Sequence, residues 1–209
     1  MKEIPENVTL SAAAKNRTAD EVIQALSAGI KVIGENYIKE AESKFELIGR
    51  KAEWHLIGHL QKNKVKKAVK IFDMIETLDS LELAESIDKE CSKINKVMSL
   101  LIEVNIASEP NKSGILPERT EELVKSCHNL RNIEIAGLMT MGPFLSDSEE
   151  LRPYFRKAKH IFDGIKNKYS NKTSWRYLSM GMSSSYKIAI EEGANIVRVG
   201  TAIFGLRSL

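Results

Sequence analysis

The feature that most constrains this chain is a regular alternation of short apolar segments with longer segments of helical period. The short segments have the length and the apolar character of buried strands. The longer segments repeat apolar residues three and four positions apart, as amphipathic helices do. We expect eight strands, at residues 8–14, 31–35, 53–58, 74–78, 97–105, 133–141, 175–181 and 196–200.

The expected helices fall between these strands, and no linker or shift of composition divides the chain. Gly29, Gly49 and Gly193 follow helical segments where C-terminal capping favours glycine. Eight alternations predict an α/β fold, a single-domain (β/α)8 TIM barrel spanning residues 1–209. A doubly wound open sheet is the alternative. The helices are expected at 19–29, 38–49, 81–94, 118–130, 150–169 and 186–193, with another around 62–70.

Composition narrows the class of protein. The chain has 209 residues, of which 43% are apolar and 28% charged, as in a folded globular domain. A net charge of +3 is too mild to indicate nucleic acid. No segment approaches the roughly 20 apolar residues of a membrane helix, and the N-terminal segment lacks a secretory signal. We therefore expect a cytoplasmic protein that binds neither nucleic acid nor membrane.

Two glycine- and hydroxyl-rich segments follow the last two expected strands. They are SMGMSSS at 179–185 and RVGTAIFG at 198–205. Barrels frequently bind phosphate with these two loops and the N-terminus of a short extra helix, and AIF is short enough to be that helix. The two loops together predict a phosphate site. The alternative is that the serines only cap a helix and Gly200 only ends a strand.

Lys15 ends the first expected strand, VTLSAAAK, and faces the same mouth of the barrel. A lysine amine beside a phosphate site suits a phosphate-bearing aldehyde, with which it forms a Schiff base. Pyridoxal 5′-phosphate is the obvious such ligand. Arg198, on the same strand face as Gly200, would meet the pyridine nitrogen and keep it unprotonated. The alternative for Arg198 is an ion pair with Glu35 or Glu103 inside the barrel.

The same segments resemble a known family over nearly the whole chain and in the same order. VTLSAAAK, GENYIKEA, WHLIGHLQKNK, NKSG, GLMTM, RPYF, SMGMS and VRVGTAIFG are similar to the pyridoxal phosphate homeostasis proteins, also known as the proline synthetase co-transcribed family. The resemblance implies an alanine-racemase-like barrel. It also implies a role in intracellular vitamin B6 homeostasis without an established enzymatic activity, and with indirect effects on amino-acid and keto-acid balance.

The resemblance assigns expected roles to individual residues. Lys15 would carry the cofactor as a Schiff base, Asn36 would neighbour the ring hydroxyl, and Arg198 would face the pyridine nitrogen. A second lysine, Lys112 in NKSG, would help cofactor exchange or transfer. The phosphate would be held by Ser183, Gly200 and Thr201, with Met180 and Gly181 shaping the loop.

Three departures from the family pattern leave these residues in place. The lysine-bearing turn is AKNRT, without the usual proline, and His59 stands where proline is common. MSSSYK at 182–187 replaces an acidic pattern and makes its loop more basic. Cofactor binding is therefore still expected.

Catalysis is not expected to be efficient. Racemases of this fold type pair the cofactor lysine with an acid–base residue from another domain or subunit, and this chain is too short to contain that domain. Tyr37 and Tyr177 are the nearest candidates for a second base, but we expect them to pack at the barrel rim. The alternatives are a small pyridoxal-phosphate-dependent racemase, and a sugar-phosphate isomerase or aldolase that uses Lys15. Apo pyridoxal-phosphate enzymes are candidate partners, and a monomer is expected, with a weak dimer as the alternative.

Other conspicuous residues are interpreted as structural. His55 and His59 lack a third metal ligand nearby, so packing or rim positions are favoured and no metal site is expected. The lysines at 62, 64, 66, 67 and 70 are typical of a solvated helix face. Cys91 and Cys127 form no metal or redox motif. Trp54, Trp175 and Phe204 are expected in the core.

Overall fold

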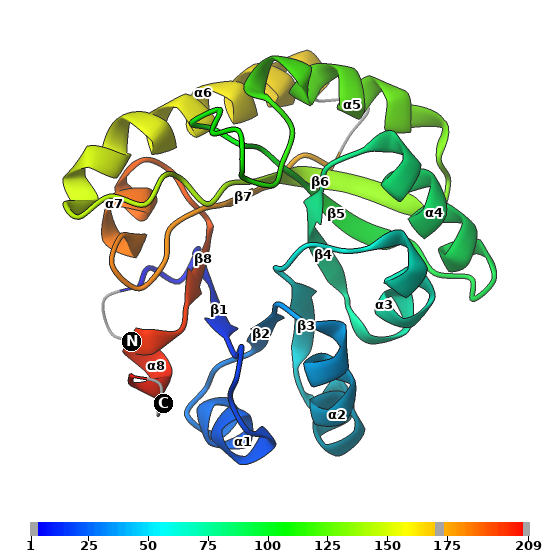
Figure 1. Ribbon diagram of the computed structural model, residues 1–209, viewed down its shortest axis with the longest axis vertical. Helices are drawn as coiled ribbons and strands as arrows, with labels where there is room; N and C mark the ends of the chain where they lie inside the picture. The colour runs from blue at the N-terminus through cyan, green and yellow to red at the C-terminus, as the bar shows by residue number, and fades with distance from the viewer. Residues whose placement is uncertain (1–3, 170–173, 207–209) are drawn as a thin grey trace.

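Eight parallel strands close into a barrel in the computed structural model, which describes residues 4–169 and 174–206 (Figure 1). Each strand pairs with the next one along the chain, and the last pairs with the first. The predicted barrel is therefore confirmed, and the open sheet is excluded. The strands are β1 (Thr9–Ala13), β2 (Val32–Glu35), β3 (Glu53–Leu56), β4 (Met74–Leu78), β5 (Met98–Glu103), β6 (Ile133–Met139), β7 (Tyr177–Ser179) and β8 (Ile196–Val199).

The helices lie outside the ring of strands (Figure 1). The first begins with a capping box: the Thr18 hydroxyl accepts from the Glu21 amide, and the Glu21 carboxylate accepts from the Thr18 amide. Gly29, Gly49 and Gly193 all have positive φ at helix ends, as predicted. The helices are α1 (Ala19–Ser27), α2 (Ile38–Ile48), α3 (Val65–Ile71), α4 (Leu81–Ser92), α5 (Thr120–Ser126), α6 (Arg152–Tyr169), α7 (Tyr186–Glu191) and α8 (Thr201–Phe204).

Most elements end within two residues of the predicted bounds, but three are shorter by three residues or more. The expected helix at 118–130 is α5 flanked by two 3-10 turns, Pro117–Arg119 and Cys127–Asn129. β5 ends at Glu103 because the next residue, Val104, leaves the ladder for an isolated bridge with Ile115. β7 keeps only three residues, since the chain turns at Gly181 with a positive φ.

The two faces of the strands bury different side chains. Residues that face the helices are mainly apolar, with Glu35 of β2 as a charged exception: Trp54, for example, is fully buried and meets the Phe45 ring of α2 edge-on at 5.8 Å. The opposite faces form the barrel interior, where a smaller apolar cluster includes Met74, Leu101 and Ile196. Above it, the interior carries polar and charged side chains. Strand alternation therefore separates a hydrophobic layer from a polar one.

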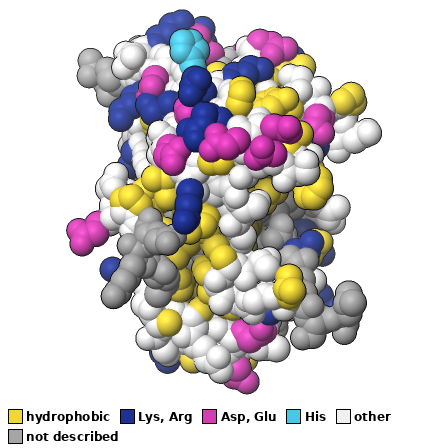
Figure 2. Space-filling view, turned by 90° about the vertical axis from the view of Figure 1, so that its left-hand side faces the viewer, with side chains coloured by type: hydrophobic (Ala, Val, Ile, Leu, Met, Phe, Trp, Pro, Cys, Tyr) yellow, Lys and Arg dark blue, Asp and Glu magenta, His cyan; other side chains and the backbone are white. Residues whose placement is uncertain are grey.

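Acidic and basic side chains gather on the face formed by the start of α6 and by α7, in the upper part of Figure 2. Arg152 binds carboxylates of Glu149, Glu191 and Glu192, and Arg156 also binds Glu192. Exposed ion pairs contribute little individually, but this network ties α6 to α7 beside the loop that precedes β8.

The residues expected in the core are mostly there. Trp54 and Trp175 are buried, as predicted, whereas Phe204 is only half-buried and packs against the guanidinium of Arg17 at 5.4 Å. Cys91 and Cys127 are free and buried, and burial raises the pKa of each thiol to about 11. Within 4–169 and 174–206, no helix has the length and apolar character needed to cross a membrane.

Gly137 is the backbone position at which the barrel is least tolerant of a side chain. It follows a register shift in β6 and has φ +157°, and a Cβ there would lie 1.8 Å from the carbonyl oxygen of Tyr177. We expect Gly137→Ala to lower the free energy of unfolding by about 2 kcal/mol or more, through strain and overpacking. Urea denaturation would measure this loss.

Gly164→Ala is the matched control, because the residue is inside α6 and, apart from its chain neighbours and the helix's own backbone, no atom of the described residues lies within 4 Å of the added Cβ. This variant should be stabilised by several tenths of a kcal/mol. Equal stability of the two alanine variants would contradict the strain assigned to Gly137.

Candidate functional site

A cavity of about 700 Å³ opens at the carboxyl ends of the strands. It contains six of the eight predicted cofactor-binding residues: Lys15, Asn36, Ser183, Arg198, Gly200 and Thr201. These come from the ends of β1, β2 and β8 and from the loop after β7, so the fold collects residues from both ends of the chain. The rest of the lining is Ala13, Arg17, Ile57, Met141, Met182, Ser184 and Ala202.

Lys15 enters this cavity from the turn after β1. Its ammonium lies 5.1 Å from the ring centroid of Tyr37, within the range of a cation–π contact. Tyr37 itself is half exposed and precedes α2. Tyr177, the other predicted rim tyrosine, packs instead against the apolar cluster inside the barrel. The tyrosine that lies near the candidate lysine is thus Tyr37.

The loops after β7 and β8 meet at the start of α8, the predicted short extra helix. The Ser183 hydroxyl accepts from the backbone amides of Gly200 at 3.2 Å and Ala202 at 3.5 Å. These amides therefore converge on one point at the edge of the cavity. Such convergent backbone donors are suited to an anion.

Met180 and Gly181 lie behind this loop and do not line the cavity. Met180 is fully buried in the core, and its amide donates to Ile196. The carbonyl of Gly181 accepts from the Arg198 amide at 3.0 Å. Neither residue reaches the cavity wall, and their expected role in shaping the loop stays a prediction.

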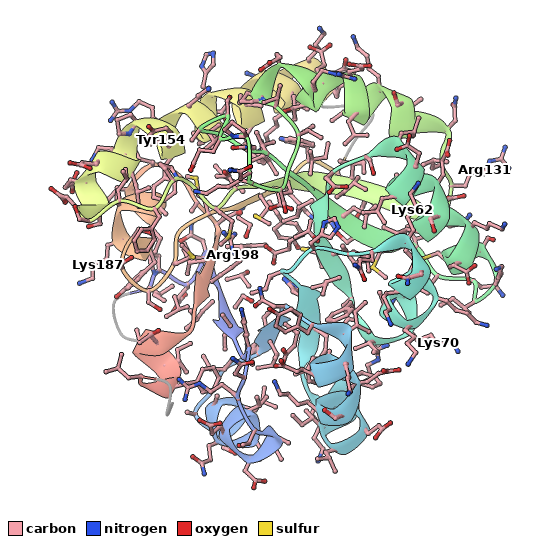
Figure 3. All side chains as sticks on the ribbon, viewed as in Figure 1. Lys62, Lys70, Arg131, Tyr154, Lys187 and Arg198 are labelled. Atoms are coloured by element: carbon pink, nitrogen blue, oxygen red, sulfur yellow. The ribbon has the colours of Figure 1, made fainter. Side chains whose placement is uncertain are left out.

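Arg198 projects into the ring of strands, where Figure 3 labels it. Its guanidinium donates to the Ser179 hydroxyl at 2.6 Å and to the Thr140 carbonyl at 2.8 Å. Burial lowers the pKa of Arg198 below its ordinary value, while the carboxylates of Glu76 and Glu103 oppose that shift.

Arg198 pairs with neither Glu35 nor Glu103, the two partners considered from the sequence. Glu35 faces away from the barrel interior and binds Lys44 at 2.6 Å. The carboxylate oxygen nearest to Arg198 belongs to Glu76, at 3.8 Å. Strand alternation explains why Glu35 is not the partner: Glu35, the last residue of β2, faces the helices, whereas the next residue, Asn36, faces the cavity.

A buried chain of hydrogen bonds connects Arg198 to His55. The Ser179 hydroxyl donates to Glu76 at 2.5 Å, and the other Glu76 oxygen lies 2.7 Å from His55 Nδ1. Burial opposes ionisation of Glu76, but His55, Arg198 and Ser179 hold its pKa below the ordinary value. Burial likewise opposes protonation of His55, but Glu53 and Glu76 raise its pKa to about 9.

Lys112 lies in an adjoining lobe of about 460 Å³. Its ammonium binds the Glu109 carboxylate at 2.7 Å and the Gly142 carbonyl at 3.1 Å. The two lobes share four wall residues and are therefore adjacent, but Lys112 does not line the cavity that contains Lys15. The shared residues are Asn36, Ile57, Met141 and Met182.

The two histidines considered as metal ligands, His55 and His59, each lie beside carboxylates and are far from equally exposed. His55 is buried between the buried carboxylate of Glu76 and the half-exposed carboxylate of Glu53, and His59 is half exposed, with Nδ1 3.5 Å from Asp79. In the described part of the chain, no group of three or more His, Cys, Asp or Glu side chains is placed to hold a metal ion. The basic residues around α3 are exposed, and Lys70 lies on the outer side of the molecule (Figure 3).

Several features of the site were not predicted from the sequence. Gly58 lies against the backbone of Asn36, and a Cβ there would come within 2.3 Å of the Asn36 carbonyl oxygen. A glycine at the end of a strand, here Gly58, is a sequence signal that could have predicted this close approach of two backbones. Met141 and Met182 carry no such signal, because methionine is usual in cores. The His55–Glu76–Ser179 chain joins β3, β4 and β7, and only the closed barrel brings β7 across its interior to the paired strands β3 and β4.

The raised pKa of His55 predicts a specific pH dependence of stability. Because the folded-state pKa of about 9 exceeds the ordinary 6.5, the stabilisation is complete below pH 6.5 and is lost as pH rises through 9. We expect the free energy of unfolding to fall over that interval by an amount on the order of 3 kcal/mol. Urea denaturation at a series of pH values would measure it.

His55→Gln should remove most of this pH dependence, whereas the exposed His59→Gln should keep it. If the free energy of unfolding fell equally between pH 6.5 and 9 in the unmodified protein and in both variants, the assignment to His55 would be contradicted.

Comparison with known proteins agrees with the geometry. Residues 10–208 match the family described as alanine racemase, N-terminal domain. The chain is 42% identical to the pyridoxal phosphate homeostasis protein of Aquifex aeolicus, over 97% of this chain and 89% of that protein. It is 35% identical to the Escherichia coli protein of the same name, over 97% of this chain and 87% of that protein.

Solved structures show the same architecture. PipY of Synechococcus elongatus PCC7942 superposes with a TM-score of 0.92 without pyridoxal phosphate, at 33% identity over 98% of this chain and 95% of PipY. The structure of PipY with pyridoxal phosphate bound superposes with a TM-score of 0.90, at 32% identity over 98% of this chain and 95% of PipY. Alanine racemase of Clostridium difficile shares the fold alone, with a TM-score of 0.78 at 15% identity over 99% of this chain and 57% of the racemase. The chain thus belongs to the pyridoxal phosphate homeostasis protein family, built on the alanine racemase N-terminal barrel.

Proposed function

We propose that this protein binds pyridoxal 5′-phosphate as a Schiff base on Lys15 and acts in intracellular vitamin B6 homeostasis. The observation that carries the proposal is that Lys15 and the loops after β7 and β8 line one cavity. The names of the relatives and the cofactor bound to PipY support the same ligand. Effects on amino-acid and keto-acid balance would be indirect.

The residues of the cavity fit this cofactor. A volume of about 700 Å³ lies within the range of small-molecule sites. Gly200 leaves the phosphate loop close to β1, since a Cβ there would lie 3.1 Å from the Ala13 carbonyl oxygen. The converging amides of Gly200 and Ala202, with the hydroxyls of Ser183 and Thr201, are donors suited to a phosphate.

Each side chain has a distinct task toward the cofactor. When bound, pyridoxal phosphate supplies an aldehyde carbon that reacts with amines and a ring that withdraws electrons. Lys15 provides the amine, and Asn36 offers an amide beside the ring hydroxyl. Arg198 can only donate hydrogen bonds, so a ring nitrogen beside it must accept and stay unprotonated. This arrangement weakens the electron withdrawal on which amino-acid chemistry depends.

The cavity wall also supports a binding role without efficient catalysis. Proton removal from a substrate carbon needs a second acid–base group within reach. Apart from Lys15, the described wall residues carry guanidinium, amide, hydroxyl, thioether or aliphatic side chains. Tyr37 is near Lys15 but belongs to the neighbouring surface groove. We propose that the protein holds the cofactor and releases it to apo enzymes that require it.

The first test is the visible spectrum of the purified protein loaded with pyridoxal phosphate. We expect a yellow protein with one pyridoxyl group on Lys15 after borohydride reduction and peptide mapping. Lys15→Ala should remove the colour and the adduct, because none of the other described residues in the cavity wall carries an amine. Lys67→Ala, at an exposed lysine of α3, is the control and should keep both.

Two other outcomes would replace the proposal. Rapid loss of the α-proton from added amino acids would favour a small racemase. A colourless protein that gains no absorption from the cofactor but acts on phosphosugars would favour an isomerase or aldolase.

We propose that Lys112 assists cofactor release, because its lobe adjoins the cofactor cavity and shares four wall residues with it. Lys112→Met should leave the dissociation constant within about twofold while slowing transfer to an apo enzyme severalfold, as expected for a group outside the binding wall. Stopped-flow spectroscopy would measure both quantities, with the exposed Lys89→Met as the control. Unchanged transfer in Lys112→Met would dismiss this role.

A further inference from the structure

Lys15 is carried by a tight turn that lies between β1 and α1. The Ala14 amide still donates to Gly34 of β2 at 2.8 Å, and the Ala14 carbonyl accepts from the Arg17 amide at 3.0 Å. Asn16 has φ +59°, a left-handed conformation that asparagine tolerates better than most residues. The barrel ladder therefore ends just before Lys15, and the turn needs other contacts to hold it.

Two side chains of α2 supply contacts on both sides of Lys15. The Lys44 ammonium donates to the Ala14 carbonyl at 2.8 Å, and the Asn16 amide donates to the Glu40 carboxylate at 2.8 Å. Glu40 and Lys44 are four residues apart on one helix face, with 3.8 Å between their charged atoms. The backbone is thus held immediately before and immediately after the candidate lysine.

Lys44 is itself fixed by a buried carboxylate. Its ammonium lies 2.6 Å from one oxygen of Glu35, and both side chains are at least nine-tenths buried. The other Glu35 oxygen finds no hydrogen-bond donor among the described residues. Burial raises the pKa of Glu35 to about 7, although Lys44 opposes the shift. Such a pair is a costly way to hold a surface turn, since an apolar pair would fill the space.

We propose that Glu35, Glu40 and Lys44 form a clamp that positions Lys15 for its reaction with the cofactor aldehyde. Lys44 and Glu40 touch the backbone rather than the cavity, so they act through Lys15 and are positioning residues. Formation of the carbon–nitrogen bond requires the Lys15 amine at the aldehyde carbon, and a displacement of about 1 Å there costs roughly a hundredfold in rate. The inference rests on the proposed function.

The clamp also explains the order of the charged and polar residues in the segment GENYIKEAESK, residues 34–44. Glu35 and Asn36 are adjacent in sequence and face opposite sides of β2, so one serves the clamp and the other the cavity. Glu40 and Lys44 follow on the first turns of α2, which packs beside the Lys15 turn. One strand–helix unit therefore builds part of the pocket and braces a residue of the neighbouring strand.

The test separates binding of the cofactor from its reaction with Lys15. Pyridoxine 5′-phosphate has the ring and phosphate but no aldehyde, so its affinity reports the cavity alone. We expect Lys44→Met and Glu40→Ala to slow Schiff-base formation by at least about tenfold while changing the pyridoxine phosphate dissociation constant less than about twofold. Stopped-flow absorbance and isothermal titration calorimetry would measure these quantities.

Two controls make the test specific. Glu40→Gln keeps an oxygen acceptor for the Asn16 amide and should recover most of the rate. Lys67→Met removes an exposed ion pair between α3 and Glu42 of α2 and should react like the unmodified protein. If Lys44→Met does not fold, Glu40→Ala carries the test alone, because the Glu40 side chain is 30% exposed.

The inference is overturned if folded Glu40→Ala forms the Schiff base at the normal rate. It is also overturned if pyridoxine phosphate affinity and reaction rate fall in the same proportion, which would indicate general damage to the cavity. Failure of the unmodified protein to form any adduct on Lys15 would instead overturn the proposed function, and the clamp with it.

Discussion

The pairing of β1 with β8 is the interaction on which the rest of the structure depends. Its register places Ser11 opposite Arg198 and Ala12 opposite Val199. Continued by one residue, the same register brings Gly200 beside Ala13, two residues before Lys15. The lysine near the N-terminus and the loop near the C-terminus whose amides are suited to an anion thus share one cavity wall. Without closure, the two features would lie at opposite edges of an open sheet.

Closure of the barrel also buries charged side chains in its interior, and hydrogen bonds hold these side chains in fixed positions. Arg198 is held by Ser179, which donates its single proton to Glu76, so the serine oxygen must accept from the arginine. Glu76 in turn is balanced by His55. Buried ion pairs seldom stabilise a fold relative to apolar residues of the same volume. What these contacts do in the structure is fix the orientation of the Arg198 guanidinium in the cavity wall.

Residue type and spacing were enough to predict part of the site, because that part depends only on where each strand ends. Lys15, Arg198 and Gly200 stand at strand ends, and in a parallel barrel all such ends meet at one face. Other parts did not follow. Met180 shares its segment with Ser183, yet it is buried behind the loop. Lys44 looks like an ordinary helix lysine, and only its packing against Ala14 and Glu35 shows otherwise. The carboxylate closest to Arg198 proved to be Glu76 rather than Glu35 or Glu103.

By itself, the sequence determined the order of strands and helices, the barrel they form, the loops suited to phosphate and the lysine suited to an aldehyde. These properties depend on periodicity and on chemistry within a few residues. The tertiary structure alone decided which charged groups meet: Arg198 with Glu76, Lys44 with Glu35, and Lys112 in an adjoining lobe rather than beside Lys15. The physical reason is that such pairings depend on the register and alternation of strands distant in sequence, and a shift of one residue would turn each side chain to the opposite face.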